Sequence, residues 1–410
     1  MKAILHHTKL PNKAFQIPIT GSKSESNRLL ILQALYPSIA IENLSESDDT
    51  KYLQKALISQ ESVVDIHHAG TAMRFLTSYF ACKENSDVIL TGSQRMQERP
   101  IGILVEALRE LGATIQYVKK EGYPPLKIKG KKITNHQVSI AAHTSSQYIS
   151  ALMLIAPSLP NGLTLQLEGK VTSVPYLKMT LSLLNQLGIE GNFSENTIQI
   201  FNKKGFTKQS VTVESDWSSA SYFYSIVALS DAAEITLKSY RNPSLQGDAL
   251  LSEIYKSLGV KTDFFPKENA IKLSKSNQEL SKKINFNLEN TPDIAQTLAV
   301  TCFGLGLGCE LTGLHTLKIK ETDRLLALKI ELEKLGASVS ITKDTLHLEP
   351  SNTIIKDISI ATYNDHRMAM AFAPLALKKS LQIEDCEVVS KSYPSFWEDL
   401  QKIGFSIQFQ

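Results

Sequence analysis

Residues 328–339, Leu-Lys-Ile-Glu-Leu-Glu-Lys-Leu-Gly-Ala-Ser-Val, contain the pattern that decides the fold. Leu328, Leu332 and Leu335 recur at helical spacing, which predicts an amphipathic helix. A glycine follows the last leucine, and this is typical of a left-handed helix cap. The residues after it alternate as in a strand. The stretch therefore predicts a helix that ends at Gly336 and leads directly into a strand.

The same pattern occurs in four other places, at 104–115 (LVEALRELGATI), 181–189 (LSLLNQLGI), 251–260 (LSEIYKSLGV) and 396–407 (FWEDLQKIGFSI). A worn, glycine-free copy lies at 52–58. The five glycines are separated by 76, 71, 77 and 68 residues. This spacing fits a repeated unit of two helices and several strands. Six such units would fill the 410 residues, which predicts an α/β chain with two domains of three units each.

The composition is that of an ordinary globular protein, with 42% hydrophobic and 21% charged residues. The formal net charge is only +3, from 44 basic and 41 acidic residues. So small a net charge creates no strong electrostatic field around the protein. We therefore do not expect the chain to attract nucleic acid or an anionic membrane. Any site for an anion must therefore be local.

The cysteines and the N-terminus indicate the compartment. Cys82, Cys302, Cys309 and Cys386 form no Cys-x-x-Cys pair, which indicates buried thiols in a reducing environment. The first residues alternate like a strand and lack an apolar signal core. The longest apolar run, 297–307, contains two glycines and is too short to span a bilayer. We expect a soluble, cytoplasmic protein.

Residues 320–324, Lys-Glu-Thr-Asp-Arg, place an acid between cations directly before the helix of the first pattern. If Thr322 or Asp323 caps that helix, the charged residues beside it lie at its N-terminus. A helix N-terminus carries unpaired N–H groups and a partial positive charge, so it attracts anions. Taken alone, a capped surface helix with charges facing water is the simpler interpretation.

Residues 20–28, Thr-Gly-Ser-Lys-Ser-Glu-Ser-Asn-Arg, form a second predicted helix start. A nucleotide-binding P-loop is excluded because the required first glycine is absent; Gln16 stands at that distance. What remains is a helix N-terminus with hydroxyls and the cations Lys23 and Arg28. That combination suits a phosphate or a carboxylate.

Further helix starts rich in Lys, Arg, His, Ser, Thr or Gln are predicted at 68–74, 95–100, 143–147, 173–176, 214–220, 290–293, 363–367 and 391–394. One such start is common in any protein. Many of them, spread over both halves, suggest that several helix N-termini converge on one anionic pocket. A substrate with several negative charges, such as a phosphate with carboxylates, would gain most from it.

Two other kinds of chemistry are not supported. Asp365 and His366 suggest a catalytic dyad, but no Ser or Cys stands in a recognisable nucleophile elbow. The nine histidines show no metal-binding spacing such as His-Glu-x-x-His. His366 is therefore predicted to be structural, and no metal site is predicted.

Taken in order, the motifs resemble those of the enolpyruvyl transferases, and within them the branch that uses shikimate 3-phosphate. The resemblance is carried by GSKSESNR (21–28), AGTAMR (69–74), RMQERPIG (95–102), SSQ (145–147), SVPY (173–176), ASYF (220–223), LQGD (245–248), PD (292–293), KETDR (320–324), YNDHRMAM (363–370) and the lysine at 391. KETDR and YNDHRMAM are the most specific of these motifs.

The resemblance implies an inside-out α/β barrel in each of two domains, with three βαβαββ repeats per domain and the active site in the cleft between them. Residues 20–215 would form the domain mainly on the shikimate 3-phosphate side. Residues 1–19 and 216–410 would form the domain that mainly binds phosphoenolpyruvate and carries the catalytic acid and base. The implied reaction adds the 5-hydroxyl of shikimate 3-phosphate to C2 of phosphoenolpyruvate and then expels phosphate. It implies neither a metal nor an organic cofactor.

The resemblance also assigns residues to each substrate. Phosphoenolpyruvate would be bound by Lys23, Gly70, Arg99, Gln147, Arg324, Arg367 and Lys391. Shikimate 3-phosphate would be bound by Lys23, Ser24, Arg28, Ser145, Ser146, Gln147, Ser173, Tyr176, Asp293, Thr316 and Lys320. The reaction requires a base for the hydroxyl, an acid for C3 of the enol and cations for the departing phosphate. Asp293 is the candidate base and Glu321 the candidate acid, with Lys23 assisting.

Five positions depart from the common family pattern: His68, Phe75, Val174, Thr316 and Lys318. They bear on the fine structure of the two substrate subsites and not on the type of reaction. Glycine is kept at position 70, which implies that the inhibitor glyphosate can enter.

Two alternatives stay open at this point. The sister transferase that modifies UDP-N-acetylglucosamine would share the fold, but it typically has a reactive cysteine in the segment matching 91–100, which here has none. An RNA-end-processing or binding protein built on related repeats would favour basic stretches interleaved with aromatic residues, which this chain lacks. We expect a monomer whose partners are the two small anionic substrates, without nucleic acid or membrane.

Overall fold

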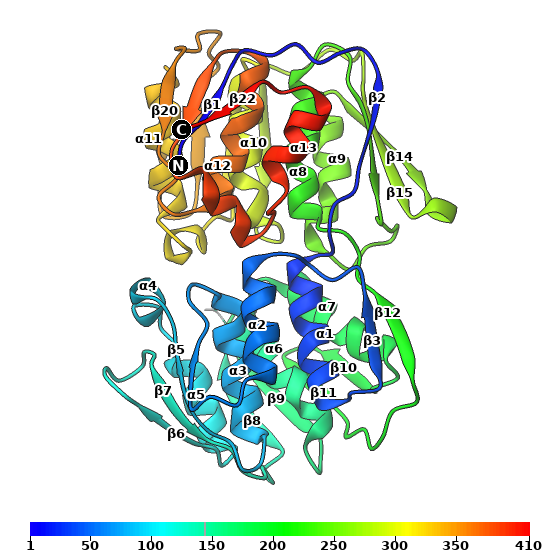
Figure 1. Ribbon diagram of the computed structural model, residues 1–410, viewed down its shortest axis with the longest axis vertical. Coiled ribbons are helices and arrows are strands. Elements are labelled where there is room, and N and C mark those ends of the chain that lie inside the picture. The colour runs from blue at the N-terminus through cyan, green and yellow to red at the C-terminus, as the bar shows by residue number, and fades with distance from the viewer. Residues whose placement is uncertain (143–144) are drawn as a thin grey trace. The chain divides into compact units, whose positions relative to one another are not determined.

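The structure is a computed structural model that describes residues 1–142 and 145–410. The chain divides into two compact units (Figure 1). Gly21–Val213 form one, here called the inserted unit, and Met1–Thr20 with Glu214–Gln410 form the other, the terminal unit. The boundaries expected at 20 and 215 move inward by one and two residues. Ser215 belongs to the terminal unit because its N–H donates to the carbonyl of Ser239 over 2.8 Å.

The terminal unit contains three four-stranded sheets with one common strand order. In each sheet the first two strands are parallel, the third strand pairs antiparallel with the second, and the fourth pairs antiparallel with the third. The first sheet consists of β2 (Ala14–Ile17), β13 (Glu234–Lys238), β15 (Ala270–Lys275) and β14 (Val260–Phe265). The second consists of β16 (Lys283–Asn287), β17 (Gly308–Thr312), β19 (Leu346–Leu348) and β18 (Val339–Ile341). The third consists of β20 (Ile358–Ile360), β21 (Leu381–Ile383), β1 (Ala3–Leu5) and β22 (Ile407–Phe409). In the third sheet the chain's first and last strands pair, so its two ends lie side by side (Figure 1).

Three helices form the centre of the terminal unit: α8 (Trp217–Leu229), α10 (Ala295–Gly304) and α12 (His366–Phe372). Every residue of α10 and α12 is buried, and in α8 only Ser218 is not. A helix that is covered on all sides must lie inside the molecule. The outer helices are α9 (Leu251–Lys256), α11 (Arg324–Lys334) and α13 (Phe396–Ile403). Helices therefore fill the interior while sheets form the outside, as expected for an inside-out barrel.

The inserted unit has two complete repeats and one shortened repeat. The complete ones consist of β4 (Val63–Asp65), α3 (Gly70–Cys82), β5 (Asp87–Thr91), α4 (Gln94–Gln97), α5 (Gly102–Glu110), β6 (Thr114–Tyr117) and β7 (Leu126–Lys129); and β8 (Gln137–Ala141), α6 (Ser146–Ile155), β9 (Leu163–Glu168), α7 (Val174–Gln186), β10 (Gly191–Ser194) and β11 (Thr197–Ile200). The third has α1 (Lys23–Leu35), β3 (Ile39–Glu42), α2 (Asp48–Ile58) and β12 (Gln209–Thr212). Its sheet has only two strands, because the worn copy at 52–58 is followed by β4 of the next repeat.

Two strands are exchanged where the chain passes between the units. β2 precedes α1 in the chain but pairs in parallel with β13 of the terminal unit. β12 precedes α8 but pairs in parallel with β3 of the inserted unit. In the chain, β2 therefore stands next to a helix of the inserted unit but completes a sheet of the terminal unit. β12 stands next to a helix of the terminal unit but completes a sheet of the inserted unit. With this exchange, the predicted α/β fold of three repeats per unit is confirmed.

The glycines that end the repeat helices adopt the predicted left-handed conformation. Gly112, Gly188, Gly259, Gly336 and Gly404 have φ values of 103°, 69°, 79°, 97° and 113°. The cap predicted for α11 is also confirmed, since the Asp323 carboxylate accepts the N–H of Leu326 over 3.1 Å. Among the described residues, no helix has the length and apolar character needed to cross a membrane.

Candidate active site

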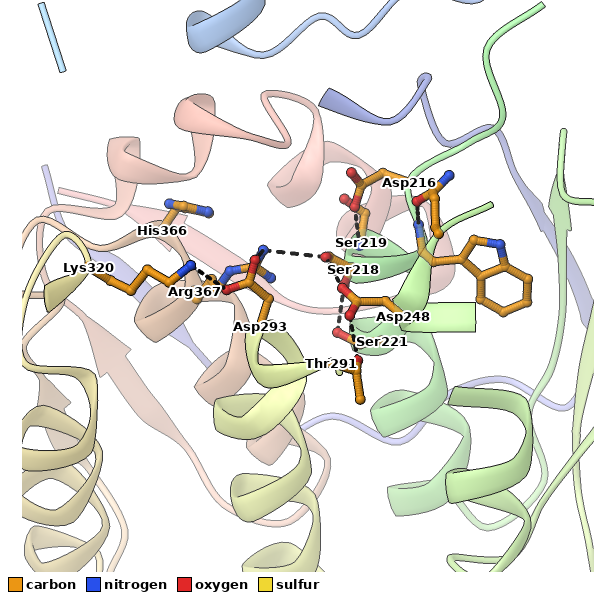
Figure 2. A network of polar contacts seen from close by, with 12 residues as sticks. Asp216, Ser218, Ser219, Ser221, Asp248, Thr291, Asp293, Lys320, His366 and Arg367 are labelled. Atoms are coloured by element: carbon orange, nitrogen blue, oxygen red, sulfur yellow. Dashed lines mark hydrogen bonds and ion pairs between the residues drawn. The ribbon is translucent and has the colours of Figure 1, made fainter. Parts of the chain in front are cut away.

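The three central helices of the terminal unit begin at the same place (Figure 2). Ser218 lies in the first turn of α8, Asp293 directly before α10, and Arg367 in the first turn of α12. Arg367 Nη2 lies 3.1 Å from Asp293 Oδ2 and 3.3 Å from Ser218 Oγ. The polar ends of three otherwise apolar helices therefore form one charged cluster, and the unpaired N–H groups of helix N-termini favour anions there.

Asp293 is shared by three cations. Its Oδ1 lies 3.0 Å from Arg324 Nη1 and 3.6 Å from Lys320 Nζ, while Oδ2 faces Arg367. Figure 2 shows the carboxylate between Lys320 and Arg367. Burial alone would raise the pKa of this carboxyl, but Arg367, Lys320 and Arg324 together hold its pKa well below the usual range. Asp293 is therefore ionised at neutral pH.

Arg324 is the first residue of α11, and its guanidinium is 2% exposed. It donates to Asp365 Oδ2 over 2.6 Å, to Glu321 Oε2 over 2.7 Å and to Asp293. A second, longer bond of 3.4 Å reaches the other Asp365 oxygen. Burial opposes the charge, yet Asp365, Glu321 and Asp293 raise the pKa of Arg324. Lys320, Glu321 and Arg324 of the motif at 320–324 thus join one charged network, while Asp323 of the same motif caps α11.

Asp365 is a central residue that sequence reasoning did not select. It is fully buried, caps α12 by accepting the N–H of Arg367 over 2.9 Å, and pairs with Arg324. An acid directly before an apolar helix is a capping signal that could have identified it. His366 Nδ1 lies 3.7 Å from Asp365 Oδ1, which is too long for a hydrogen bond. This geometry agrees with the prediction that His366 is structural.

Asp248 was also missed, although the motif that contains it was noted. It lies in the short helix η2 (Gly247–Leu250), is 5% exposed, and accepts hydrogen bonds from the hydroxyls of Ser218 and Thr291. Burial, and then the charge of Asp293, raise the pKa of Asp248. Because Ser218 also accepts from Arg367, Asp248 is linked to the cluster through a hydroxyl.

Two more candidates of the terminal unit lie at helix ends. Lys391 ends the short helix η7 (Cys386–Lys391), and its Nζ donates to the carbonyl of Asn364 over 2.6 Å. Thr316 precedes the short helix η5 (Leu317–Ile319), and its buried Oγ1 has no hydrogen-bond partner among the described residues. The Nε of Arg367 is likewise buried and has no hydrogen-bond partner within residues 1–142 and 145–410. A buried donor without a partner is costly unless a ligand or water satisfies it.

In the inserted unit, Arg28 is a buried cation that donates its hydrogen bonds to neutral groups. It is 2% exposed and donates to Thr180 Oγ1 (2.7 Å), to the carbonyl of Ser24 (2.7 Å) and to Ser150 Oγ (3.1 Å). The rings of Phe75 and Tyr176 lie 5.5 Å and 5.9 Å from its guanidinium carbon. Burial lowers the pKa of Arg28 to about 10. The predicted residues Ser24, Arg28 and Tyr176 are thus brought together.

Gly70 and Arg99 meet within the inserted unit. A Cβ atom on Gly70, the first residue of α3, would lie 2.7 Å from Arg99 Nη1. Only glycine permits this approach without a shift of the guanidinium. Gln147 of α6 donates through Nε2 to the Oγ1 of Thr71, which follows Gly70 in α3, over 3.5 Å.

The other candidates of this unit also lie at helix starts. Ser145 caps α6 by accepting the N–H of Gln147 over 3.3 Å, and Ser146 begins that helix. Lys23 begins α1, and Ser173 precedes α7 in a left-handed conformation with φ of 53°. Residues 143 and 144, which begin the predicted helix start at 143–147, lie outside the described residues.

No group of three or more His, Cys, Asp and Glu side chains in residues 1–142 and 145–410 is arranged to hold a metal ion. The charged clusters are instead pairs of cations with carboxylates, or cations with neutral donors and acceptors.

Comparison with solved structures places the fold among the enolpyruvyl transferases. An EPSP synthase from Acinetobacter baumannii superposes with a TM-score of 0.79 at 20% identity, covering 100% of both chains. The enolpyruvyl transferase NikO from Streptomyces tendae has a TM-score of 0.71 at 15% identity, covering 99% of this chain and 98% of that one. At these identities the likeness concerns the fold.

Sequence comparison narrows this class to one family. The family model described as EPSP synthase (3-phosphoshikimate 1-carboxyvinyltransferase) matches residues 53–400. The 3-phosphoshikimate 1-carboxyvinyltransferase of Bacteroides fragilis is 45% identical over 96% of both chains. That of Histophilus somni is 36% identical over 95% of this chain and 96% of the relative. The chain belongs to the EPSP synthase family.

Proposed function

We propose that the chain transfers the enolpyruvyl group of phosphoenolpyruvate to the 5-hydroxyl of shikimate 3-phosphate, giving 5-enolpyruvylshikimate 3-phosphate and phosphate. The observation that carries this proposal is the 45% identity, over 96% of both chains, to a relative named for that transfer. The cluster of Lys320, Arg324 and Arg367 around Asp293 supports it, because the reaction needs cations and a carboxylate in one place. The sister transferase is less favoured, since residues 91–100 contain no cysteine.

The inserted unit is proposed to contribute mainly to shikimate 3-phosphate binding. Arg28 supports this role because its charge is buried and forms no ion pair within the described residues. A phosphate would supply the missing negative charge. Ser24, Ser145, Ser146, Gln147, Ser173 and Tyr176 are assigned to the same substrate, together with Lys23, Asp293, Thr316 and Lys320. The buried hydroxyl of Thr316, which has no partner in the described part of the chain, is available to an incoming acceptor.

Arg324, Arg367 and Lys391 of the terminal unit, with Lys23, Gly70, Arg99 and Gln147 of the inserted unit, are proposed to bind phosphoenolpyruvate. The unpartnered Nε of Arg367 supports its part in this set, because a carboxylate or phosphate oxygen would satisfy it. Arg324 already donates to three carboxylates. An anion that takes one of its N–H groups must therefore compete with Asp293 or Glu321.

In the proposed addition step, Asp293 accepts the proton of the 5-hydroxyl while the hydroxyl oxygen bonds to C2 of the enol. Glu321 takes up a proton once an anion displaces it from Arg324, and it donates that proton to C3 in the same step. In the elimination step the Glu321 carboxylate takes a proton back from C3, and the electron pair of that C–H bond forms the C2–C3 double bond. The C2–O bond to phosphate breaks, and phosphate departs with the bonding pair and takes the proton held by Asp293. Lys23 and the arginines balance the negative charge of the leaving group. A carboxylate with so low a pKa is a weak base, so Asp293 becomes effective as the substrate anions draw its three cations away.

We further propose that the protein works as a cytoplasmic monomer. The free thiols of its four cysteines suit a reducing compartment. All assigned residues come from one copy of the chain. Light scattering of the purified protein would test the oligomeric state.

Phosphate release from phosphoenolpyruvate tests the reaction itself. We expect release with shikimate 3-phosphate, with a product heavier by one enolpyruvyl group in mass spectrometry. Release with UDP-N-acetylglucosamine instead would establish the sister activity. Turnover of RNA ends without use of phosphoenolpyruvate would overturn the proposal altogether.

A further inference from the structure

The buried carboxylate of Glu331 ties helix α11 to the segment that follows β20. Glu331 is fully buried, and its Oε1 accepts the hydroxyl of Tyr363 over 2.7 Å. Its Oε2 accepts the N–H of Ala361 over 3.2 Å. Lys334, three residues further along α11, donates to both oxygens over 2.8 Å. We refer to Glu331, Lys334 and Tyr363 as the α11 clasp.

Helix α13 has a buried carboxylate at the same position of the repeat, which binds a tyrosine of the segment that leads into this helix. Asp399 lies five residues before Gly404, as Glu331 lies five residues before Gly336. Asp399 is 1% exposed and accepts the hydroxyl of Tyr393 over 2.9 Å. Lys402, again three residues further along, donates to it over 2.8 Å. We refer to Asp399, Lys402 and Tyr393 as the α13 clasp. The other three repeat helices that end in such a glycine have Ala107, Leu183 and Ile254 at the position of the carboxylate, so among these five helices only α11 and α13 have an acid there.

Both clasped tyrosines belong to segments that carry a cation of the candidate site. Tyr363 precedes Arg367 by four residues, and Tyr393 follows Lys391 by two. The two segments touch, because Lys391 Nζ donates to the carbonyl of Asn364 over 2.6 Å. The clasps therefore hold two neighbouring segments that meet at this hydrogen bond.

The clasped turn before Arg367 has an unfavourable backbone conformation. Tyr363 and Asn364 both have positive φ, 54° and 55°. Positive φ is uncommon for any residue with a side chain and is an outlier for a bulky one, and it persists only where the surroundings enforce it. Glu331 binds the turn from one side, and Arg324 binds Asp365 at its other end over 2.6 Å. The turn is thus fixed at both ends by one helix, α11.

We propose that the pairs Glu331–Tyr363 and Asp399–Tyr393 are positioning pairs that fix Arg367 and Lys391 for phosphoenolpyruvate. This inference rests on the proposed function, because it takes both cations as ligands of that substrate. Neither pair touches the substrate. Removing a tyrosine hydroxyl lets its segment relax, so the cation on that segment moves while the fold persists. The effect falls on phosphoenolpyruvate and not on shikimate 3-phosphate.

The test uses Tyr363→Phe and Tyr393→Phe in the full-length protein, with Tyr224→Phe as the matched control. Tyr224 is also buried in the terminal unit and bonds Thr262 Oγ1 over 2.9 Å, but it lies on neither segment. We expect each of the first two variants to raise the KM for phosphoenolpyruvate about tenfold and leave the KM for shikimate 3-phosphate unchanged. The control should lower thermal stability comparably without changing either KM. The double variant E331A/Y363F should have a KM for phosphoenolpyruvate no higher than that of E331A alone, since both changes remove the hydrogen bond between residues 331 and 363.

Equal KM values for phosphoenolpyruvate in all three tyrosine variants would overturn the proposal. Arg367→Lys and Lys391→Met, measured in parallel, separate this failure from that of the site assignment. If these two raise that KM while the tyrosine variants do not, only the clasps are refuted. If none of the variants changes it, the assignment of both cations to phosphoenolpyruvate fails as well.

Discussion

Both units bury arginines, but they surround them differently. In the inserted unit, Arg28 binds hydroxyls and a carbonyl, and Arg74 binds the carbonyls of Gly70 (3.1 Å) and Pro100 (3.3 Å). Burial lowers the pKa of each arginine to about 10. In the terminal unit, Arg324 and Arg367 face carboxylates, which raise the pKa of both despite burial.

This difference assigns the two units different tasks. A buried cation with neutral neighbours has charge to offer, so an anion can bind it without breaking an ion pair. A cation that is already paired gives up part of that pairing when an anion arrives. In the terminal unit the released partner is Asp293, the candidate base. Anion binding there would therefore raise the pKa of Asp293 and activate it, whereas binding in the inserted unit would have no such consequence.

The largest effect is expected from Asp293→Asn, which removes the carboxylate shared by three cations. Turnover should fall by about 10²- to 10⁴-fold, because the base is lost, while the KM for shikimate 3-phosphate changes little. Steady-state phosphate release measures both quantities. Asp323→Asn is the matched control, since it changes an acid at the neighbouring helix start that only caps α11. Turnover close to wild type in Asp293→Asn would remove this residue from the mechanism.

The sequence predicted the parts of this cluster that are set by local signals. The helix end at Gly336 and the cap at Asp323 follow from a glycine after a leucine and an acid before a helix, and both are confirmed. The helix starts that bear Lys320, Arg324 and Arg367 were likewise placed by patterns of a few residues. Local backbone rules act over one or two turns, so a short stretch of sequence suffices for them.

The parts that were missed depend on contacts between distant segments. Asp365 binds Arg324 across 41 positions, and Asp248 accepts from Thr291 across 43. The exchange of β2 and β12 between the units is likewise a matter of pairing and not of local pattern. No periodicity or spacing within one segment reports which carboxylate a buried arginine will meet. Such partners follow only once the repeats are packed together.

The second prediction compares the free energies of unfolding of Arg324→Met and Arg28→Met, measured in denaturant. Arg324→Met should destabilise its unit by about 3–5 kcal/mol, because it leaves buried carboxylates such as Asp365 without a cation. Arg28→Met should cost less than about 1 kcal/mol, because it removes a buried charge that has no carboxylate partner.

The two tryptophans make the first measurement specific. Trp217 and Trp397 both lie in the terminal unit, so their fluorescence reports on Arg324→Met, while far-UV circular dichroism follows both units. If both variants lost the same free energy of unfolding, the carboxylates around Arg324 would have no measurable effect on stability, and the contrast between the two units would be wrong.

Gly70→Ala tests the neutral surroundings of the inserted unit with a smaller change. The new Cβ would lie 2.7 Å from Arg99 Nη1, so the guanidinium must move. We expect the KM for phosphoenolpyruvate to rise roughly five- to tenfold with little change in that for shikimate 3-phosphate. Gly102→Ala is the control, because Gly102 also begins a helix and its added Cβ would meet nothing closer than 3.4 Å. A similar rise in both variants would point to a general effect of alanine at a helix start.

The smallest effect concerns acid stability. Because the folded pKa of Asp293 is depressed, its ionised form stabilises the terminal unit fully above the unfolded pKa of about 3.9. This contribution is lost as the pH falls below that value. Asp248 acts in the opposite sense, since its pKa is raised and protonation relieves its burial. Tryptophan-detected denaturation at pH 6, 5, 4 and 3 should therefore show a steeper acid loss in wild type than in Asp293→Asn. Parallel curves would mean that the three cations do not depress the pKa of Asp293, and the contrast between the two units would then rest on Arg324 and Asp365 alone.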